Sequence, residues 1–376
     1  PFLLLGVALL IALGFEFVNG FHDTANAVAT VIYTNSLPPH FAVVWSGFFN
    51  FLGVLLSSGA VAFGIIALLP VELILQVGSS AGFAMIFALL IAAILWNLGT
   101  WWLGLPASSS HTLIGSIIGV GVANALMHGR DGTSGVDWGQ AIKIGYALLL
   151  SPLIGFAFAA LLLLALRAFV KNRSLYKAPK GDTPPPWWIR GMLIATCTGV
   201  SFAHGSNDGQ KGMGLIMLIL VGTLPMAYAL NRTMPAGESL QFAAVAEVTQ
   251  AALIPLWVKI AVAIALGLGT MVGWKRIVVT VGEKIGKTHL TYAQGASAEM
   301  VAMLTIGAAD MYGLPVSTTH VLSSGVAGTM VANGGGLQMK TIRNLLMAWV
   351  LTLPAAILLS GSLYWLFTNL MALAWN

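Results

Sequence analysis

The sequence has little charge and almost no cysteine. Only 8% of its 376 residues are charged, whereas a soluble domain carries roughly 25% charged residues. The single cysteine, Cys197, excludes an internal disulfide framework, and we expect it to be a small buried apolar residue. The shortage of charge excludes an ordinary soluble protein.

Apolar residues take the place of charge. They make up 58% of the chain, and the mean hydropathy is +0.89. Apolar stretches of about 20 residues are long enough to cross a bilayer, and the length allows roughly ten such spans. We interpret residues 2–18 as part of a first span, with a cleaved signal peptide as the alternative. The sequence therefore predicts an all-α polytopic membrane protein.

The few basic residues are concentrated in two segments. Six of them surround a polar stretch with three consecutive prolines, namely Arg167, Lys171, Arg173, Lys177, Lys180 and Arg190. Basic loops face the cytoplasm, which favours a cytoplasmic linker over a nucleic-acid patch. We place this linker at 171–186, between halves at 1–170 and 187–376. The second basic segment, also predicted to be cytoplasmic, contains Lys275, Arg276, Lys284 and Lys287.

The two halves share two motifs in the same order. The segment 104–111 (GLPASSSH) returns as 313–320 (GLPVSTTH), and ten of the 21 positions from Gly104 and Gly313 onward are identical. A shorter pair precedes it, in which Gly20–Asn26 aligns with Gly205–Lys211. Duplicated halves are typical of secondary transporters, which bind their substrate where the repeats meet.

Each motif interrupts an apolar run. We expect Gly20–Asn26 and Gly205–Lys211 to break helices near the membrane midplane. The other pair predicts two helical hairpins that enter and leave by the same side, with helices at 82–103 and 108–125 and at 296–312 and 317–332. Gly115 and Gly119 have the spacing that allows close helix packing.

Polar side chains in these motifs are candidates for an anion site. A carboxylate in a span costs at least ~2.5–3.5 kcal/mol, so Asp23 and Asp208 need a compensating role. Hydroxyl clusters follow a proline in each half, where a helix begins: Ser108, Ser109, Ser110, Ser317, Thr318 and Thr319. Hydroxyls there cap the helix, or they bind an oxyanion together with the free N–H groups. Their duplication beside a duplicated aspartate favours the oxyanion.

Two aspartates beside an anion require positive charge. Oxygen ligands from Asp23, Asn26, Asn207 and Asp208 suit a hard cation such as Na⁺ or Mg²⁺. Lys211 supplies one fixed charge. The candidates for coupling, proton transfer or support of the ligands are His22, His111, His320 and Glu299, of which Glu299 has an apolar partner, Leu90, in the other half.

These paired segments resemble the signatures of the PiT family of inorganic phosphate transporters over nearly the whole chain. The residues His22–Asn26 and Asn207–Gly212 are most similar to the bacterial low-affinity branch. The resemblance implies an inner-membrane symporter of phosphate, carried as a neutral metal complex such as that with Mg²⁺ and coupled to protons. It also implies inverted repeats, a homodimer and no permanently bound cofactor. Because His22 and Lys211 depart from the sodium-coupled pattern, Na⁺ coupling is the less favoured alternative.

Three other functions fit parts of the sequence. An intramembrane serine protease would use Ser80, in a G-x-S-x-G segment, with His111 as its base. Ser80 has no counterpart in the second half, where His289 stands. A channel would use similar polar groups but has no need of broken helices. A sulfate transporter would leave Asp23 and Asp208 without compensation, since sulfate does not usually travel with a metal.

Overall fold

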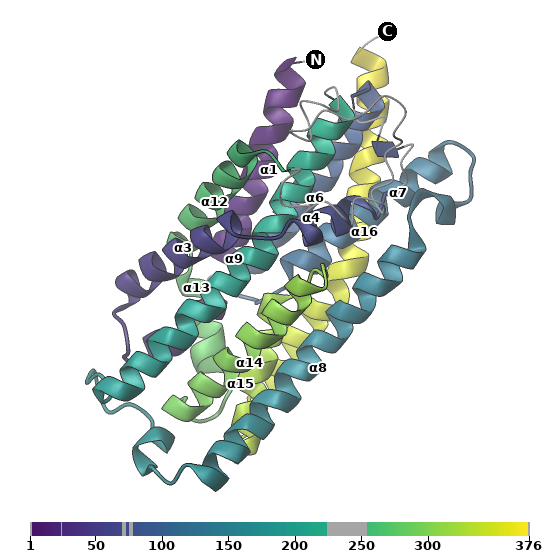
Figure 1. Cartoon of the computed structure of the whole chain (residues 1–376). Helices are drawn as coiled ribbons and strands as arrows, with labels where there is room; N and C mark the ends of the chain where they lie inside the picture. Colours follow the sequence, from purple (N-terminus) through teal and green to yellow (C-terminus); the bar gives the residue numbers. More distant parts are fainter. Residues whose placement is uncertain (1, 24, 70–72, 75–77, 224–253, 375–376) are drawn as a thin grey trace.

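The computed structural model describes residues 2–23, 25–69, 73–74, 78–223 and 254–374. They form an elongated bundle of helices, with both termini at one end and the predicted linker at the other (Figure 1). No strand occurs in the described part of the chain. This confirms the predicted fold class, an all-α polytopic membrane protein.

Within its described residues, the first half contains four helices of 19 residues or more and several shorter ones. In chain order they are α1 Phe2–Asp23, α2 Ala25–Tyr33, α3 Pro39–Leu55, α4 Ala60–Ile66, α6 Ser80–Trp102, α7 Ser109–Met127, the short η1 Gly132–Gly135 and α8 Trp138–Phe169. The predicted break at Gly20–Asn26 covers the end of α1 and the start of α2, both helical, and residue 24, which lies outside the described residues.

The second half has a similar order of elements, with its longest helices, α9 and α16, at its two ends. After η2 Arg173–Tyr176, its elements are α9 Trp187–Thr223, α12 Leu256–Met271, α13 Lys275–Val279, η4 Thr280–Lys284, α14 Tyr292–Met311, α15 Thr318–Ala332 and α16 Met339–Ala374. The predicted linker falls between α8 and α9. α1 and α9 run in opposite directions in Figure 1. That the two halves are inverted repeats stays a prediction.

Five helical stretches of the described residues are long and apolar enough to span a membrane. The number rises to seven if two bent pairs, α3 with α4 and α12 with α13 and η4, each count as one span. Both pairs bend sharply, by 74° and 57°. The multi-pass architecture predicted from hydropathy is present.

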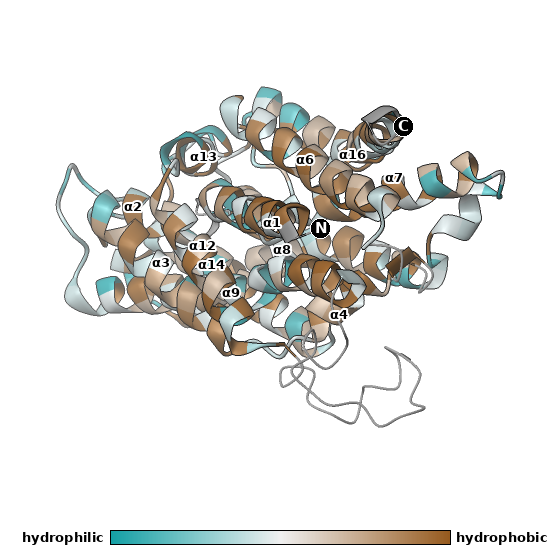
Figure 2. Cartoon of the chain, turned by 90° about the horizontal axis from the view of Figure 1, so that it is seen from above, coloured by the Kyte–Doolittle hydropathy of each residue, from teal (hydrophilic) through white to brown (hydrophobic). Residues whose placement is uncertain are grey.

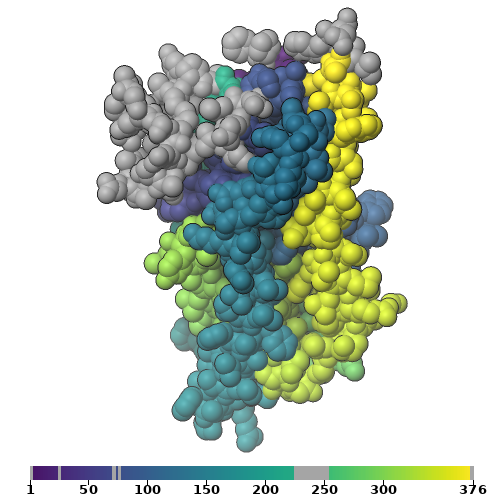
Figure 3. All heavy atoms as spheres, turned by 90° about the vertical axis from the view of Figure 1, so that its right-hand side faces the viewer, coloured from purple at the N-terminus to yellow at the C-terminus, as the bar shows by residue number. Residues whose placement is uncertain are grey.

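The two halves pack into one another rather than side by side. α8 of the first half packs against α15 of the second, α16 packs against α7, and α3 packs against α9. α8 and α16 both run along the face that Figure 3 shows, while the view along the bundle shows α1 near its middle (Figure 2). As predicted, small residues let α7 approach closely: a Cβ on Gly115 would lie 2.8 Å from the Leu353 carbonyl oxygen of α16.

The predicted break in α9 is wrong. α9 continues as one helix of 37 residues through Gly205–Lys211. Its glycines serve close packing instead, because a Cβ on Gly205 would lie 2.1 Å from the Asn50 carbonyl oxygen of α3. Its polar side chains also have partners, since Ser206 and Gln210 each donate to Asp310 of α14 over 2.6 Å. A polar segment need not leave the helix when neighbouring helices satisfy it.

Both predicted hairpins are present as helix–turn–helix pairs. α6 and α7 pack together around the turn 103–108, and α14 and α15 pack together around the turn 312–317. Gly104 and Gly313 occupy equivalent places in the two turns, with φ of 66° and 65°. Glycine alone adopts this left-handed conformation readily, which explains why the motif begins with it.

Candidate cation and phosphate site

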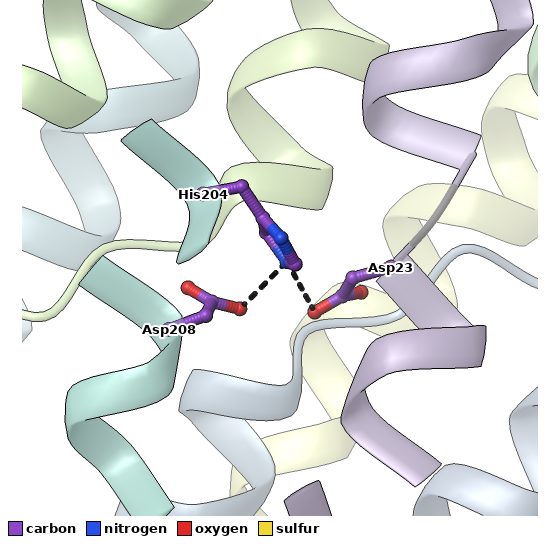
Figure 4. A group of neighbouring side chains, drawn as sticks. All are labelled: Asp23, His204 and Asp208. Carbon is purple, nitrogen blue, oxygen red and sulfur yellow. Dashed lines mark ion pairs between the residues drawn. The ribbon is translucent and has the colours of Figure 1, made fainter. Parts of the chain in front are cut away.

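The two motif aspartates meet in the interior of the bundle, on either side of His204 (Figure 4). The His204 Nε2 atom lies 3.2 Å from Asp208 Oδ2 and 4.0 Å from Asp23 Oδ2. All three side chains are buried, and their ligand atoms lie within 4.8 Å of one another. Two carboxylates and an imidazole at this spacing form a candidate divalent-cation site.

The ring of His204 is held in the orientation that such a site requires. Its Nδ1 atom lies 2.6 Å from Asn50 Oδ1 of α3. The Asn50 amide nitrogen donates to Ser46 and Thr270, which leaves its oxygen to accept from His204. Nδ1 therefore carries the proton, and Nε2 faces the carboxylates. Fixing the tautomer of a histidine ligand through its second nitrogen is a common feature of metal sites.

Lys211 supplies the fixed positive charge predicted from the sequence. Lys211 follows Asp208 by three residues on α9, and its Nζ atom lies 2.9 Å from Asp208 Oδ1. It also donates to Ser109 Oγ of α7 over 3.2 Å. Lys211 thus connects the second aspartate to the first hairpin. With His204 protonated, the two carboxylates of the site are balanced by two cations.

Hydroxyl groups from both hairpins meet at Asp23. Ser109 of α7 donates to Asp23 Oδ2 over 2.9 Å, and Thr319 of α15 donates to Asp23 Oδ1 over 2.6 Å. Ser110 donates across to the Val316 carbonyl oxygen over 2.6 Å. The structure therefore brings one hydroxyl group of each cluster, Ser109 and Thr319, to the same aspartate.

The other cluster residues stand at the helix starts. Ser108 and Ser317 are the N-caps of α7 and α15, and each accepts a hydrogen bond from a histidine backbone N–H three residues on, over 3.1 Å. Thr318 is the first residue of α15. At Ser108 and Ser317 the capping interpretation is the one that the geometry supports.

The remaining cation candidates have different surroundings. Asn207 Nδ2 donates to the Leu314 carbonyl oxygen, and its Oδ1 accepts from the Val316 N–H. The side-chain amide of Asn207 therefore binds the second hairpin turn rather than the aspartates. His22 lies between Asp23 Oδ1, at 3.2 Å, and Thr100 Oγ1, at 3.0 Å. The side chain of Asn26 lies outside the described residues.

The rings of the two motif histidines lie against one another at a tilt of 39°. The rings of His111 and His320 lie 4.7 Å apart between centroids, and Trp349 of α16 stacks on His320 at 4.0 Å. Trp349 also donates to the Pro106 carbonyl oxygen, which ties α16 to the first hairpin turn. The two histidines therefore form a contact between the second helices of the two hairpins, and His320 also contacts α16.

Glu299 lies apart from this cluster. Its buried carboxyl accepts hydrogen bonds from Thr30 of α2 and Thr196 of α9. It therefore joins three helices through two hydroxyl groups. A buried carboxyl group whose described partners are neutral is suited to gaining and losing a proton.

Sequence reasoning missed His204 and its partner Asn50. His204 has the i, i+4 spacing to Asp208 that puts both on one helix face, and Asn19 stands four residues before Asp23 in the first half. This spacing was the available signal. Asn50, in contrast, stands in an apolar stretch of α3 and gives no local sign of its role.

The fold and this site define a class of protein, a multi-pass membrane transporter. Residues 19–360 match the family model described as the Phosphate transporter family, to which the chain belongs. It is similar to the low-affinity inorganic phosphate transporter PitB of Escherichia coli (strain K12), with 41% identity, covering 98% of this chain and 97% of the relative. It is also similar to a probable low-affinity inorganic phosphate transporter of Bacillus subtilis (strain 168), with 35% identity and 94% coverage of each chain.

The fold is also that of a solved structure, named as the sodium-dependent phosphate transporter. The TM-score is 0.74 at 21% sequence identity, over 97% of this chain and 99% of the other. Together, these bacterial relatives and the apolar helices confirm the predicted inner-membrane transporter of the PiT family.

The protease alternative is excluded by this family and by the geometry. Ser80 begins α6, and His111 lies beyond the far end of that helix. A helix of 23 residues separates them by roughly 30 Å, since each residue adds about 1.5 Å. The protein is a transporter rather than an enzyme, as the sequence predicted.

Proposed function

We propose that this phosphate transporter carries inorganic phosphate inward as a neutral complex with a divalent cation, in symport with protons. The observation that carries the proposal is the cluster of Asp23, His204 and Asp208, whose ligand atoms lie within 4.8 Å of one another. Such a cluster is suited to the cation, and the hydroxyl groups beside it are suited to the phosphate.

The charges of the site favour a neutral complex. Lys211 and, when it is protonated, His204 balance the two aspartates. A phosphate dianion alone would add two negative charges to a buried site, where unscreened charge is costly. A dianion accompanied by a divalent cation adds none. The proposed complex therefore brings no net charge into the site, and the total charge changes only by the proton that His204 gives up when it binds the cation.

Binding of the cation also provides a link to protons. A histidine must be neutral to act as a metal ligand, so binding at His204 Nε2 would release a proton if that nitrogen carried one. Because an imidazole takes part, we expect Mn²⁺ or Zn²⁺ complexes to be bound at least as well as those of Mg²⁺.

The phosphate is expected to bind where the two hairpins begin their second helices. Ser109 and Thr319 donate to Asp23 in this structure. Once a cation neutralises Asp23, the same hydroxyl groups are free to turn to phosphate oxygens. The positive ends of the helix dipoles at the starts of α7 and α15 favour the same anion.

Glu299 is the proposed carrier of a transported proton. It joins α2 and α14 to α9, which bears His204 and Asp208, so a change in its protonation acts on the helix of the site. Glu299→Gln keeps the shape and removes the titration. We expect this variant to retain phosphate binding and to lose the dependence of uptake on the pH gradient.

The test is phosphate uptake into proteoliposomes in which the pH gradient, Na⁺ and the divalent cation are varied separately. We expect uptake to need the divalent cation and the pH gradient, and to continue when K⁺ replaces Na⁺. His204→Asn should weaken the dependence of phosphate uptake on the divalent cation. The control is His128→Asn, which changes an exposed histidine at the end of α7 and should leave that dependence unchanged. Uptake that stops without Na⁺, or ignores the divalent cation, would refute the proposal.

A further inference from the structure

A cavity on the outside of the bundle shares no lining residue with the cluster of Asp23, His204 and Asp208. Its volume is about 720 Å³, and it is lined by three cations, Lys275, Arg276 and Lys284, and by three tryptophans, Trp101, Trp102 and Trp274. No acidic side chain is among its lining residues. We call this the basic tryptophan pocket. α13, which carries two of the cations, stands at the outer edge of the bundle in Figure 2.

This pocket lies at the level where the lipid-facing surface changes from apolar to basic. The exposed apolar side chains of α12 end with Leu268 and Val272, directly before Lys275. Those of α3 begin at Phe41, directly after His40, which also lines the pocket. Tryptophan with lysine or arginine at such a boundary is typical of the bilayer interface.

The boundary is the cytoplasmic one. Tyr33, at the end of α2, donates to Glu283 of η4, next to Lys284. Two residues further, Asn35 donates to the Gly181 carbonyl oxygen of the basic linker. The two basic segments therefore lie at the same end of the bundle, where the positive-inside rule places the cytoplasm. That face of a bacterial membrane offers anionic lipid headgroups.

The cations of the pocket are arranged for a phosphate group. The Arg276 guanidinium lies over the rings of Trp102 and Trp101, at 4.5 and 5.1 Å, and donates to the Trp102 carbonyl oxygen over 2.9 Å. These contacts fix the guanidinium and leave other N–H groups for an anion. Lys275 and Lys284 are exposed beside it.

From this geometry we infer that the basic tryptophan pocket binds the headgroup of an anionic phospholipid. A free phosphate ion offers the same oxygen atoms. The lipid is favoured because Trp102 and Leu103 are 64% and 70% exposed at the pocket, which provides apolar surface for the acyl chains.

A lipid in this pocket would contact the turn of the first hairpin and stabilise its position. Leu103 and Gly104 of the hairpin turn line the cavity. Thr280 donates to the Gly104 carbonyl oxygen over 2.7 Å, so the wall of the pocket is already tied to the turn. Ser109, which follows this turn, contacts Asp23. We therefore expect the lipid to stabilise the folded protein as well as bind to it.

The test measures lipid binding to the purified, delipidated protein in detergent, by native mass spectrometry and by the thermal unfolding midpoint. Phosphatidylglycerol should bind and raise the midpoint, and phosphatidylcholine should do so much less. Lys275→Gln with Lys284→Gln should weaken phosphatidylglycerol binding about 25-fold, since each basic residue near a lipid surface contributes about fivefold. Lys340→Gln with Arg343→Gln, two exposed basic residues of α16 outside the pocket, is the matched control.

Three results would overturn the inference. The first is equal binding of the two lipids by the unaltered protein, a comparison that does not depend on any variant. The second is an equal loss of binding in the pocket variant and the α16 control, which would show general attraction to basic residues. The third is displacement of phosphatidylglycerol by millimolar inorganic phosphate, which would assign the pocket to the free ion.

Discussion

Asp23 and Asp208 occupy equivalent positions in the two halves but have different partners. Asp23 accepts hydrogen bonds from Ser109 and Thr319, one from each hairpin. Asp208 is paired with Lys211 at 2.9 Å and with His204 at 3.2 Å, both on its own helix. Asp23 is held by two hydroxyl groups and by His22, whereas Asp208 is held by the Lys211 ammonium and by His204.

This difference indicates a division of labour within a duplicated site. The hydroxyl groups around Asp23 belong to the hairpins rather than to the helix of Asp23, so they can change partner when a cation binds to the carboxylate. The partners of Asp208 are carried by α9 itself, a turn before and a turn after it. We infer that Asp208 anchors positive charge in the membrane, whereas Asp23 exchanges its partners during transport.

The largest effect is expected from Asp208→Asn. From the sequence alone, a neutral asparagine is expected to be tolerated at either aspartate because it removes a buried charge. The ion pair reverses this expectation for Asp208, since the variant leaves Lys211 buried without its partner. We expect a loss of about 3–5 kcal/mol in the free energy of unfolding.

A compensating variant tests the reason for that loss. Asp208→Asn combined with Lys211→Met removes both charges and should recover most of the stability in denaturant unfolding, although uptake stays absent. If the double variant is as unstable as the single one, the ion pair does not explain the role of Asp208.

The next effect concerns Asp23→Asn, which should disturb transport more than folding. Asparagine keeps one oxygen that can accept from Ser109 or Thr319, and its NH2 group can donate to the other hydroxyl oxygen. We therefore expect the free energy of unfolding to fall by only about 1 kcal/mol. Loss of a carboxylate from the proposed cation site should weaken Mn²⁺ affinity at least about 10–100-fold, the range seen even for groups that only support metal ligands. Calorimetric titration with Mn²⁺ measures this directly. A variant that binds the cation as tightly as the parent would remove Asp23 from the cation site.

The parts of the fold and of the site that could be predicted from the sequence are those that depend on local sequence features. The duplicated motifs predicted both hairpins to within a few residues, because glycine and proline at a turn act locally. They also identified Asp23, Asp208 and the hydroxyl clusters, since buried polar residues are conspicuous in apolar runs.

What the sequence could not show depends on contacts between distant segments. α9 remains helical because Asp310 satisfies Ser206 and Gln210 from another helix. The role of His204 depends on Asn50, 154 residues earlier in the chain. Similarly, Asn207 looked like a cation ligand, but the turn of the second hairpin engages both ends of its amide.

A smaller effect should separate the hydroxyl groups at Asp23 from the others. Ser109→Ala and Thr319→Ala remove the hydroxyl groups proposed to turn to phosphate, so we expect phosphate binding to weaken by about 1–3 kcal/mol in each. Ser110→Ala is the control, because Ser110 donates to a backbone carbonyl oxygen instead. Equilibrium binding of labelled phosphate in the presence of Mn²⁺ compares the three. An equal loss in all three would mean that the hydroxyl groups act only by holding the hairpins together.

The smallest effect is expected at the two capping serines, Ser108 and Ser317. Each accepts a hydrogen bond at the start of its helix, and replacement of an N-cap serine by alanine costs about 1 kcal/mol. Ser108→Ala and Ser317→Ala should therefore lower the unfolding free energy by that amount and leave phosphate affinity nearly unchanged. Glycine, which costs only a few tenths of a kcal/mol at an N-cap, should restore the stability. If phosphate affinity instead falls as much as in Ser109→Ala, and glycine does not restore it, these hydroxyl groups bind the substrate and the division between capping and binding positions is wrong.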